Sequence, residues 1–304
     1  MSALLQMSGP VVDLIYRVRA LPASGEEAEV EGFMLSPGGG FNAMVAARVA
    51  GMAVRCGGSL GTGPLAQIVR AGLERHGIEM PRPADPAHDQ GCCTVLVEPS
   101  GERTFVASEG AEGHLTAADL AALPLAGCGW MLVSGYTLHY RGAREALAGW
   151  LATARELPAL VFDPSPLVAG LGAEYLKPAL DRAAWISANR REAAHLTGHD
   201  DPAESARALA RGRAGALVRD GAAGCVLATE QGCRHVPPHP VRPKDTNGAG
   251  DSHIGSFIAR LDVTGDADHA ARYANIAAAL STTVFGPATA PAAAEVERVL
   301  AQDA

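Results

Sequence analysis

The chain has little positive charge and no long hydrophobic run. Among its 304 residues, 25 Lys and Arg stand against 33 Asp and Glu, which gives a formal net charge of −8. Because no basic surface is indicated, the composition argues against nucleic acid or a membrane as a partner. No run reaches the roughly 18 uninterrupted apolar residues of a membrane-spanning helix, and the first residues lack the basic start and apolar core of a secretion signal.

Cysteine pairs are also absent. The six cysteines form no Cys-x-x-Cys motif, and the two adjacent ones are poorly spaced for one shared metal. They are Cys56, Cys92, Cys93, Cys128, Cys225 and Cys233. We expect most of them to be buried small apolar residues in a protein of the reducing cytoplasm.

The sequence does contain a regular alternation of short apolar runs and helical patterns. Apolar spacing predicts helices within 63–77, 144–157 and 201–213. The runs with the length of buried strands are 3–9, 53–59, 130–136, 158–165, 184–189 and 215–221. This alternation predicts an α/β fold with a doubly wound, mostly parallel sheet between two layers of helices.

Two stretches interrupt the alternation, at 25–35 and 91–108. The second has a Pro-Ser-Gly-Glu turn between two runs of β-forming residues and predicts a hairpin. Both stretches are predicted to form a small antiparallel accessory sheet.

The stretch DTNGAGD at 245–251 leads directly into an apolar-periodic helix. Gly248 and Gly250 let the backbone turn, so the free N–H groups and the positive end of the helix dipole favour an anion such as a phosphoryl group. Asp251 either complements the dipole as an ordinary first-turn carboxylate or accepts a proton from an attacking hydroxyl. The sequence has neither the P-loop pattern nor an N-terminal GxGxxG fingerprint, which disfavours a dinucleotide-dependent oxidoreductase.

A second glycine-rich stretch, SPGGGFNA, lies at 36–43. Three successive glycines allow the backbone to approach a ligand closely, and Asn42 offers a polyol both a donor and an acceptor. The alternative is a flexible loop with Asn42 as a helix cap.

In this order, about 200 residues apart, the two stretches resemble the two signatures of the ribokinase-like (PfkB) carbohydrate kinase family. Weaker matches are SGERTF (100–105), VSGY (133–136), FDPSP (162–166), ANRREAAHLTG (188–198) and LVRDGAAGCVLAT (217–229). The resemblance implies a single ribokinase-like kinase domain over 1–304, with lid segments at about 13–36 and 91–108 and a homodimer formed through the lid.

The resemblance also implies roles for individual residues. Asp251 would be the general base, and the acceptor sugar would lie against Asp13, although Asp13 could equally be a surface residue at a strand end. The anion hole would be formed by Gly248, Ala249 and Gly250 with the N–H of Asp251, and the acceptor pocket would include Gly38, Gly39, Gly40 and Asn42.

For the nucleotide, the resemblance implies ATP with Mg²⁺. Asn189 and Glu192 match an element that holds the magnesium and its waters, although they could also be a polar helix start. The remaining nucleotide residues would be Gly221 and Gly224 along ATP, Asn275 near the adenine, and Arg219, which either meets a phosphate or solvates its turn. In some relatives K⁺ activates the anion hole at positions that correspond to Asp245 and Asn247, and whether it does so here stays open.

Several positions depart from the family pattern. His253 stands where phenylalanine is usual, and we expect a helix-packed histidine rather than a group that tunes the base. Leu167 replaces an arginine, which leaves the acceptor open. Arg103 in the lid is expected to be a surface charge rather than a contact for an anionic substrate.

The function expected from these residues is an ATP-dependent kinase that phosphorylates a hydroxyl of a small sugar, ribose- or fructose-like. A nucleoside kinase of the same fold is the alternative, with Phe33, Phe41 and Phe105 as an aromatic wall for the base. A sugar phosphate is less favoured, because few Lys or Arg lie in the expected lid. A non-catalytic sugar-binding regulatory protein is disfavoured, since Asp251 and its glycines are present.

Overall fold

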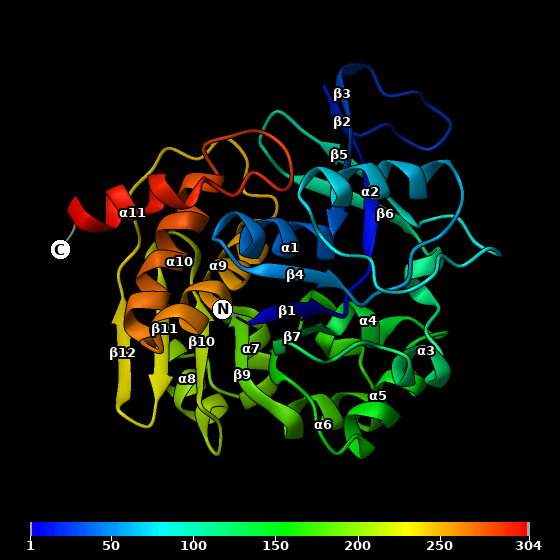
Figure 1. The fold of residues 1–304 in the computed structure, drawn as a ribbon. Coiled ribbons are helices and arrows are strands. Elements are labelled where there is room, and N and C mark those ends of the chain that lie inside the picture. The colour runs from blue at the N-terminus through cyan, green and yellow to red at the C-terminus, as the bar shows by residue number, and fades with distance from the viewer. Residues whose placement is uncertain (1, 303–304) are drawn as a thin grey trace.

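The larger of two β-sheets forms the body of the protein and has eight strands in the order β12-β11-β10-β9-β8-β7-β1-β4 (Figure 1). The computed structural model describes residues 2–302. The strands are β1 (Ala3–Gln6), β4 (Ala53–Cys56), β7 (Cys128–Ser134), β8 (Ala159–Asp163), β9 (Ala183–Asn189), β10 (Gly215–Arg219), β11 (Cys225–Thr229) and β12 (Gly232–Val236). The neighbouring strands β10, β9, β8, β7, β1 and β4 pair in parallel, and β11 and β12 extend the sheet beyond β10 in antiparallel fashion. The six predicted strands are confirmed, whereas β11 and β12 were not predicted as strands.

Helices cover both faces of this sheet because alternate residues of its strands point to opposite sides. Leu4 belongs to the core on one face and Leu5 to the core on the other. The first face is covered by α1 (Gly40–Val49), α2 (Pro64–Arg75), α9 (Ala249–Thr264) and α10 (Ala267–Ser281), with α11 (Ala293–Gln302) packed on α10. The second face is covered by α3 (Ala117–Ala121), α5 (Arg144–Thr153), α6 (Ala173–Arg182), α7 (Arg190–Thr197) and α8 (Pro202–Ala210). The three helices predicted within 63–77, 144–157 and 201–213 are confirmed as α2, α5 and α8.

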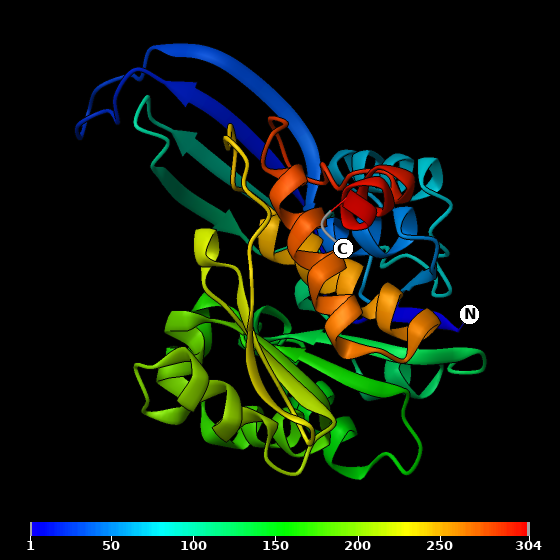
Figure 2. The same cartoon turned by 90° about the vertical axis from the view of Figure 1, so that its left-hand side faces the viewer.

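The smaller sheet projects from the body as a lid, with strand order β3-β2-β5-β6 (Figure 2). Its strands are β2 (Pro10–Val18), β3 (Val30–Gly39), β5 (Cys92–Val97) and β6 (Arg103–Ser108). The predicted β5–β6 hairpin is confirmed, but the expectation of a purely antiparallel sheet is wrong, because β2 and β5 pair in parallel. These two strands are joined through α1, β4 and α2 in the body, so no tight turn constrains them to run in opposite directions.

The structure also corrects the expectation about the cysteines. Only Cys56 and Cys225 are buried, and the other four are partly exposed, so the expectation that most are buried is wrong. Cys92 and Cys93 lie in β5 of the two-sided lid, Cys128 begins β7, and Cys233 lies on the edge strand β12, where one side of the chain is open. Among residues 2–302 no cluster of metal-binding side chains occurs, and none of their helices combines the length and apolarity of a membrane span.

The fold places one edge of the large sheet opposite the start of α9. The parallel strands β1, β7, β8, β9 and β10 all end on this edge, where α/β proteins bind their ligands. The residues at or just past these ends are Ser8, Ser134, Asp163, Asn189 and Arg219.

Candidate active site

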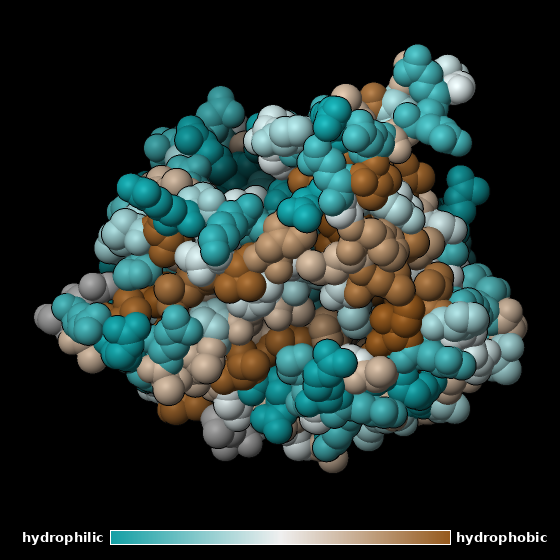
Figure 3. All heavy atoms as spheres, turned by 90° about the horizontal axis from the view of Figure 1, so that it is seen from above, coloured by the Kyte–Doolittle hydropathy of each residue, from teal (hydrophilic) through white to brown (hydrophobic). Residues whose placement is uncertain are grey.

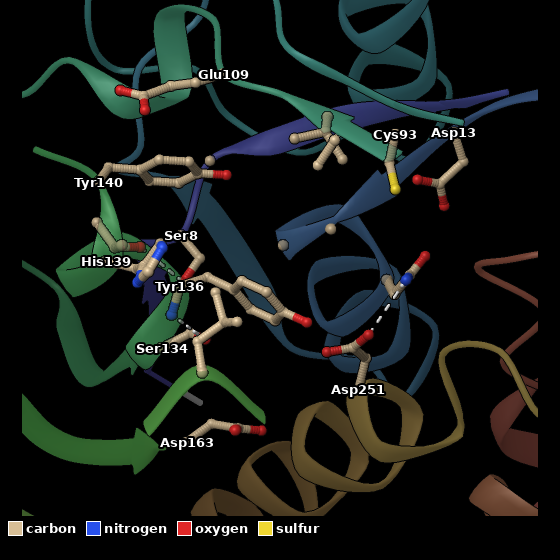
Figure 4. Close-up of a pocket in the computed structure, with 18 of the residues that line it drawn as sticks. Ser8, Asp13, Cys93, Glu109, Ser134, Tyr136, His139, Tyr140, Asp163 and Asp251 are labelled. Atoms are coloured by element: carbon tan, nitrogen blue, oxygen red, sulfur yellow. Dashed lines mark hydrogen bonds between the residues drawn. The ribbon is translucent and has the colours of Figure 1, made fainter. Parts of the chain in front are cut away.

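A cavity of about 460 Å³ lies between the lid and this edge of the large sheet. In Figure 4, Asp251 rises from the start of α9, Asp13 and Cys93 descend from the lid on the same side, and Glu109, His139 and Tyr140 line the opposite side. Predicted site residues that line the cavity are Asp13, Gly39, Gly40, Asn42, Asn247 and Asp251. Side chains from both glycine-rich stretches therefore meet in one place, although the stretches are about 200 residues apart in the sequence.

Asp251 lies in the first turn of α9 and is held by the second glycine-rich stretch. Asn42 Nδ2 donates a hydrogen bond to Asp251 Oδ2 at 3.2 Å. Burial, together with the negative charge of Asp163, raises the pKa of Asp251 to about 6, although the Asn42 hydrogen bond and Arg219 act in the opposite direction. The group is therefore ionised at neutral pH but poised close to it, as a general base requires.

The turn before Asp251 depends on its glycines. Gly248 has φ 73°, a left-handed conformation that side chains other than glycine adopt at a cost. A Cβ on Gly250 would lie 2.5 Å from Arg219 Nη1, so the backbone there passes directly against a guanidinium group. The first N–H groups of α9 have no acceptor within the helix. Together these features create a positive environment beside the base.

The acceptor side of the cavity combines Asp13 with closely approaching backbone. A Cβ on Gly40 would lie 2.1 Å from the backbone carbonyl oxygen of Ser8, so this position requires glycine. A Cβ on Gly38 would meet the carboxylate of Asp13, so glycine there lets Asp13 lie directly against the backbone. Burial, reinforced by the charge of Asp251, raises the pKa of Asp13 to about 7. Asn42 Oδ1 is buried without a hydrogen-bond partner among the described residues. This side therefore holds polar groups that are ready to accept hydroxyl hydrogens.

The nucleotide side is organised differently, around Arg219. Its Nη2 lies 3.3 Å from Asp163 Oδ2 and 3.6 Å from Glu192 Oε2, and its side chain is 13% exposed. Burial, reinforced by the charge of Asp163, raises the pKa of Glu192, while Arg219 lowers it. The turn-solvating role considered for Arg219 does not match this buried position among acidic side chains.

Asn189 and Glu192 form a reciprocal cap at the start of α7. Asn189 Oδ1 accepts from the Glu192 N–H at 2.9 Å, and Glu192 Oε2 accepts from the Asn189 N–H at 2.7 Å. The polar helix start is therefore present. Glu192 and Asp163 both pair with Arg219, so these two carboxylates suit a magnesium ion that keeps most of its waters once Arg219 pairs with phosphate oxygens instead.

The remaining nucleotide residues lie along β10, β11 and α10. Gly221 (φ 54°) and Gly224 (φ 89°) turn the chain between β10 and β11, which agrees with the glycine spacing of the predicted nucleotide segment. Asn275 is buried, and its Nδ2 donates to the carbonyl groups of Val236 and Pro237 at 3.0 and 2.9 Å. His253 is buried and lies 3.1 Å from Asn275 Oδ1, so the expectation of a helix-packed histidine is confirmed. Burial and the charge of Arg219 lower its pKa to about 3, so it is neutral.

Asp245 and Asn247 precede the glycine turn, and Asp245 is buried. Asp245 Oδ1 accepts from the Asn247 N–H at 2.9 Å and Oδ2 accepts from the Gly286 N–H at 3.0 Å. Arg103 of the lid also binds Asp245 and lies 3.3 Å from the Thr246 hydroxyl. The expectation that Arg103 is a surface charge is wrong, because the lid presses its guanidinium against this loop.

Sequence reasoning missed much of the cavity wall. The missed residues include Ser8, Glu109, Ser134, Tyr136, His139, Tyr140 and Asp163. Asp163 ends β8, so a search for carboxylates at the carboxyl ends of the predicted parallel strands would have found it. Glu109 and Tyr140 follow no such signal, because the turns that contain them are arranged by packing.

The aromatic wall considered for a nucleoside is only partly correct. Phe41 is buried in the core on the inner face of α1, and Phe33 does not line the cavity. Phe105 does line it, together with Tyr136 and Tyr140. An aromatic wall therefore exists, but most of it comes from residues outside the lid.

Comparisons with known proteins agree with this architecture. Residues 7–293 match the pfkB family carbohydrate kinase. The chain is 28% identical over 267 residues to an uncharacterized sugar kinase, YegV, of Escherichia coli (strain K12), covering 85% of this chain and 82% of that protein. It is 30% identical over 295 residues to the ATP-dependent ribose-1-phosphate kinase of Halopiger xanaduensis, covering 95% of each.

Solved structures show the same fold. A putative ribokinase II from E. coli superposes with a TM-score of 0.87 over all of both chains at 22% identity. The nucleoside kinase of Methanocaldococcus jannaschii gives a TM-score of 0.84 over 99% of each chain at 15% identity. The chain therefore belongs to the pfkB family of carbohydrate kinases, and it is a phosphotransferase that acts on an alcohol group.

Proposed function

We propose that the protein transfers the γ-phosphoryl group of ATP to a hydroxyl of a small neutral sugar, ribose- or fructose-like. The observation that carries this proposal is the position of Asp251. It lies between the glycine turn at the start of α9 and a cavity that Asp13 and Asn42 also line, and Asn42 is hydrogen-bonded to it. A base, an anion hole and a polyol pocket thus share one site.

In this mechanism Asp251 accepts the proton of the acceptor hydroxyl as that oxygen attacks phosphorus. With its pKa raised to about 6, Asp251 is ionised at neutral pH and is a stronger base than an unperturbed carboxylate. The N–H groups of Gly250 and Asp251 stabilise the negative charge of the transferred group, whereas the Ala249 N–H donates to the carbonyl of Thr246 at 3.3 Å and shapes the turn. Asn42 orients Asp251 through its hydrogen bond and offers its free Oδ1 to the acceptor.

For the nucleotide, Arg219 contributes a positive charge. Its guanidinium group lies against the backbone of Gly250, beside the place where phosphate oxygens would lie. Asp163 and Glu192 flank it and would hold magnesium, directly or through water, and the bound ion would neutralise the phosphate charge. Gly221 and Gly224 would pass along ATP. Asn275 would act near the adenine through its hydrogen bonds to the carbonyl groups of residues 236 and 237, which hold that segment in place.

The cavity lining favours a neutral acceptor. Among the described residues that line it, none is Lys or Arg, whereas Asp13, Glu109, Asp163 and Asp251 carry acidic groups. A phosphate on the acceptor would be repelled by these carboxylates. This favours a free sugar over the sugar phosphate named for the Halopiger relative.

A nucleoside is the second candidate, and the size and aromatic wall of the cavity favour it. A volume of about 460 Å³ exceeds the needs of a single pentose, and Phe105, Tyr136 and Tyr140 offer surfaces for a base.

We also propose a homodimer formed through the lid. Phe33, Leu35 and Val106 are 57%, 42% and 62% exposed. The strand register places them on the outer face of the lid, whereas Asp13 lies on the face that covers the cavity. Figure 3, a view from above, shows apolar side chains beside the hydrophilic tip of the lid. A second copy would cover these side chains. Sedimentation of the protein and of Phe33→Glu tests this, and a monomeric wild type contradicts it.

The experiment that tests the kinase proposal measures Mg²⁺-dependent ADP formation with pentoses, hexoses, sugar acids, sugar phosphates and nucleosides. One acceptor should give turnover, and Asp251→Asn should reduce kcat with it by about 10³-fold or more. Turnover with a nucleoside alone would select the second candidate. If no acceptor is phosphorylated while a sugar still raises Tm, the protein is a sugar-binding regulator and the proposal fails.

A further inference from the structure

Asp245 is a buried carboxylate whose charge is already compensated within the fold. It accepts hydrogen bonds from the N–H groups of Asn247 and Gly286, and Arg103 forms an ion pair with it. The Arg103 side chain is 19% exposed and that of Asp245 is 5% exposed, so this pair is largely shielded from water. A buried, paired charge of this kind holds its neighbours firmly in place.

A monovalent cation fits this arrangement poorly. Both carboxylate oxygens of Asp245 accept from N–H donors, and the guanidinium group of Arg103 supplies the positive charge that K⁺ would bring. A second cation at the same carboxylate would meet Arg103 directly, at the cost of like-charge repulsion.

Arg103 comes from the lid, which ties the lid to the loop before the anion hole. The strand register puts Arg103 on the same lid face as Asp13, with Asp13 paired to Cys93 and Arg103 paired to Val97 along β5. The loop that Arg103 contacts leads within a few residues to Gly248, the residue with positive φ at the start of α9. A lid that covers the acceptor through Asp13 therefore also presses a positive charge onto the loop that shapes the anion hole.

Further contacts also join the lid to the segment that holds this loop. Arg17 of β2 stacks over the Phe285 ring at 5.4 Å, and a Cβ on Gly286 would lie 3.1 Å from the sulfur of Met34 in β3. The backbone N–H groups of Lys244 and Asp245 donate to the carbonyl of Thr282 at 2.7 and 3.0 Å. The 244–247 loop and the 282–286 segment thus form one unit, and three lid strands rest on it.

We propose that Arg103 is a positioning residue that replaces an activating monovalent cation at Asp245 and makes the order of the anion hole depend on closure of the lid. This inference rests on the proposed function, since the anion hole matters only if a phosphoryl group is transferred. It assigns the lid a second task besides covering the acceptor.

The test compares wild type, Arg103→Ala and a matched control, Arg19→Ala, in K⁺, Na⁺, choline and guanidinium salts at equal ionic strength. Arg19 is also a lid arginine in ion pairs, but its partners among the described residues are Glu29 and Glu31 at the exposed lid tip. Wild type and Arg19→Ala should be insensitive to the cation. Arg103→Ala should lose kcat by about 10- to 100-fold in choline and regain activity with guanidinium or K⁺.

Several outcomes would overturn the proposal. Strong activation of wild type by K⁺ would show that a cation still acts at Asp245. Full activity of Arg103→Ala in choline, or a loss that neither guanidinium nor K⁺ restores, would show that Arg103 does not replace the charge of a cation.

A second readout separates this inference from the kinase proposal. Hydrogen exchange of the Asn247 amide, which donates to Asp245, should be faster in Arg103→Ala and slow again with guanidinium. If no acceptor is phosphorylated by wild type, the kinase proposal fails, but this exchange difference still supports the link between the lid and the loop. Unchanged exchange in Arg103→Ala overturns that link.

Discussion

The two halves of the site differ in how their polar groups are occupied. On the acceptor side, Asp13 and Asn42 face a cavity, and Asn42 Oδ1 has no partner within the described residues. On the nucleotide side, Asp163 and Glu192 each form an ion pair with Arg219. The acceptor half is therefore preformed for a neutral polyol, whereas the nucleotide half must exchange internal ion pairs for contacts with a charged ligand.

This difference has a physical reason. Hydroxyl groups gain little by displacing an ion pair, so a pocket for them works best with unpaired acceptors already in place. Burying an acidic side chain without a partner has a large cost. In the acceptor half this cost raises the pKa of Asp13 to about 7, whereas in the nucleotide half Arg219 offsets it as a counter-charge for Asp163 and Glu192.

Among variants that compare the two halves, the largest effect is expected from breaking the ion pairs of the nucleotide half. Arg219→Met leaves Asp163 and Glu192 facing each other without their shared cation. We expect kcat/KM for ATP to fall by about 100-fold or more and the free energy of unfolding to fall by about 3 kcal/mol. The stability deficit should be greatest above pH 7 and smaller in acid, where protonation of Glu192, whose pKa burial raises, removes its repulsion with Asp163. Steady-state kinetics and urea unfolding measure both effects.

Arg234→Met is the control for this variant. Arg234 lies in the edge strand β12, pairs with Asp268 of α10, and does not line the cavity. It should leave KM for ATP unchanged. If Arg219→Met lowers stability but leaves the ATP kinetics intact, Arg219 serves the fold alone.

A smaller and more selective effect is expected from the acceptor half. Asp13→Asn keeps the shape of the side chain but removes the charge that accepts hydroxyl hydrogens. We expect KM for the acceptor to rise by about tenfold, with KM for ATP nearly unchanged. Initial rates with each substrate varied in turn measure this, and an equal change in both KM values would show that the two halves are not independent.

The smallest expected effect concerns the pH dependence of the base, which joins the halves. Because the pKa of Asp251 is raised to about 6, kcat/KM should increase with pH through this value as the carboxylate ionises. In Asp163→Asn a negative neighbour is lost, which favours ionisation, so the rising limb should move to lower pH by up to about one unit. A pH–rate profile of both proteins measures this shift. A limb that stays in place or moves to higher pH would contradict the influence of Asp163.

The sequence predicted the parts of the fold that depend on local pattern. The six apolar runs became strands of the large sheet, because a buried parallel strand is recognisable from a short continuous apolar run. The antiparallel strand β12 (GCRHV) lacks such a run. The strand β11 (CVLAT) has one, but it follows β10 across a short glycine turn instead of a helix, so the alternation of strands and helices does not report it. The parallel pairing of β2 with β5 depends on a crossover through the body, which no turn signal reports.

For the site, the sequence alone determined the glycine turn, its aspartate and the family they resemble, because glycine spacing and a carboxylate at a helix start are local features. Only the tertiary structure decided how distant residues meet. The Asn42 contact with Asp251 spans 209 positions, and that of Arg103 with Asp245 spans 142. For Arg219 the sequence left a phosphate contact and a turn-solvating role open, and only the tertiary structure places its guanidinium group between Asp163 and Glu192. The interactions of a charged side chain depend on which groups the folded chain brings within a few ångströms of it, and one sequence does not contain those distances.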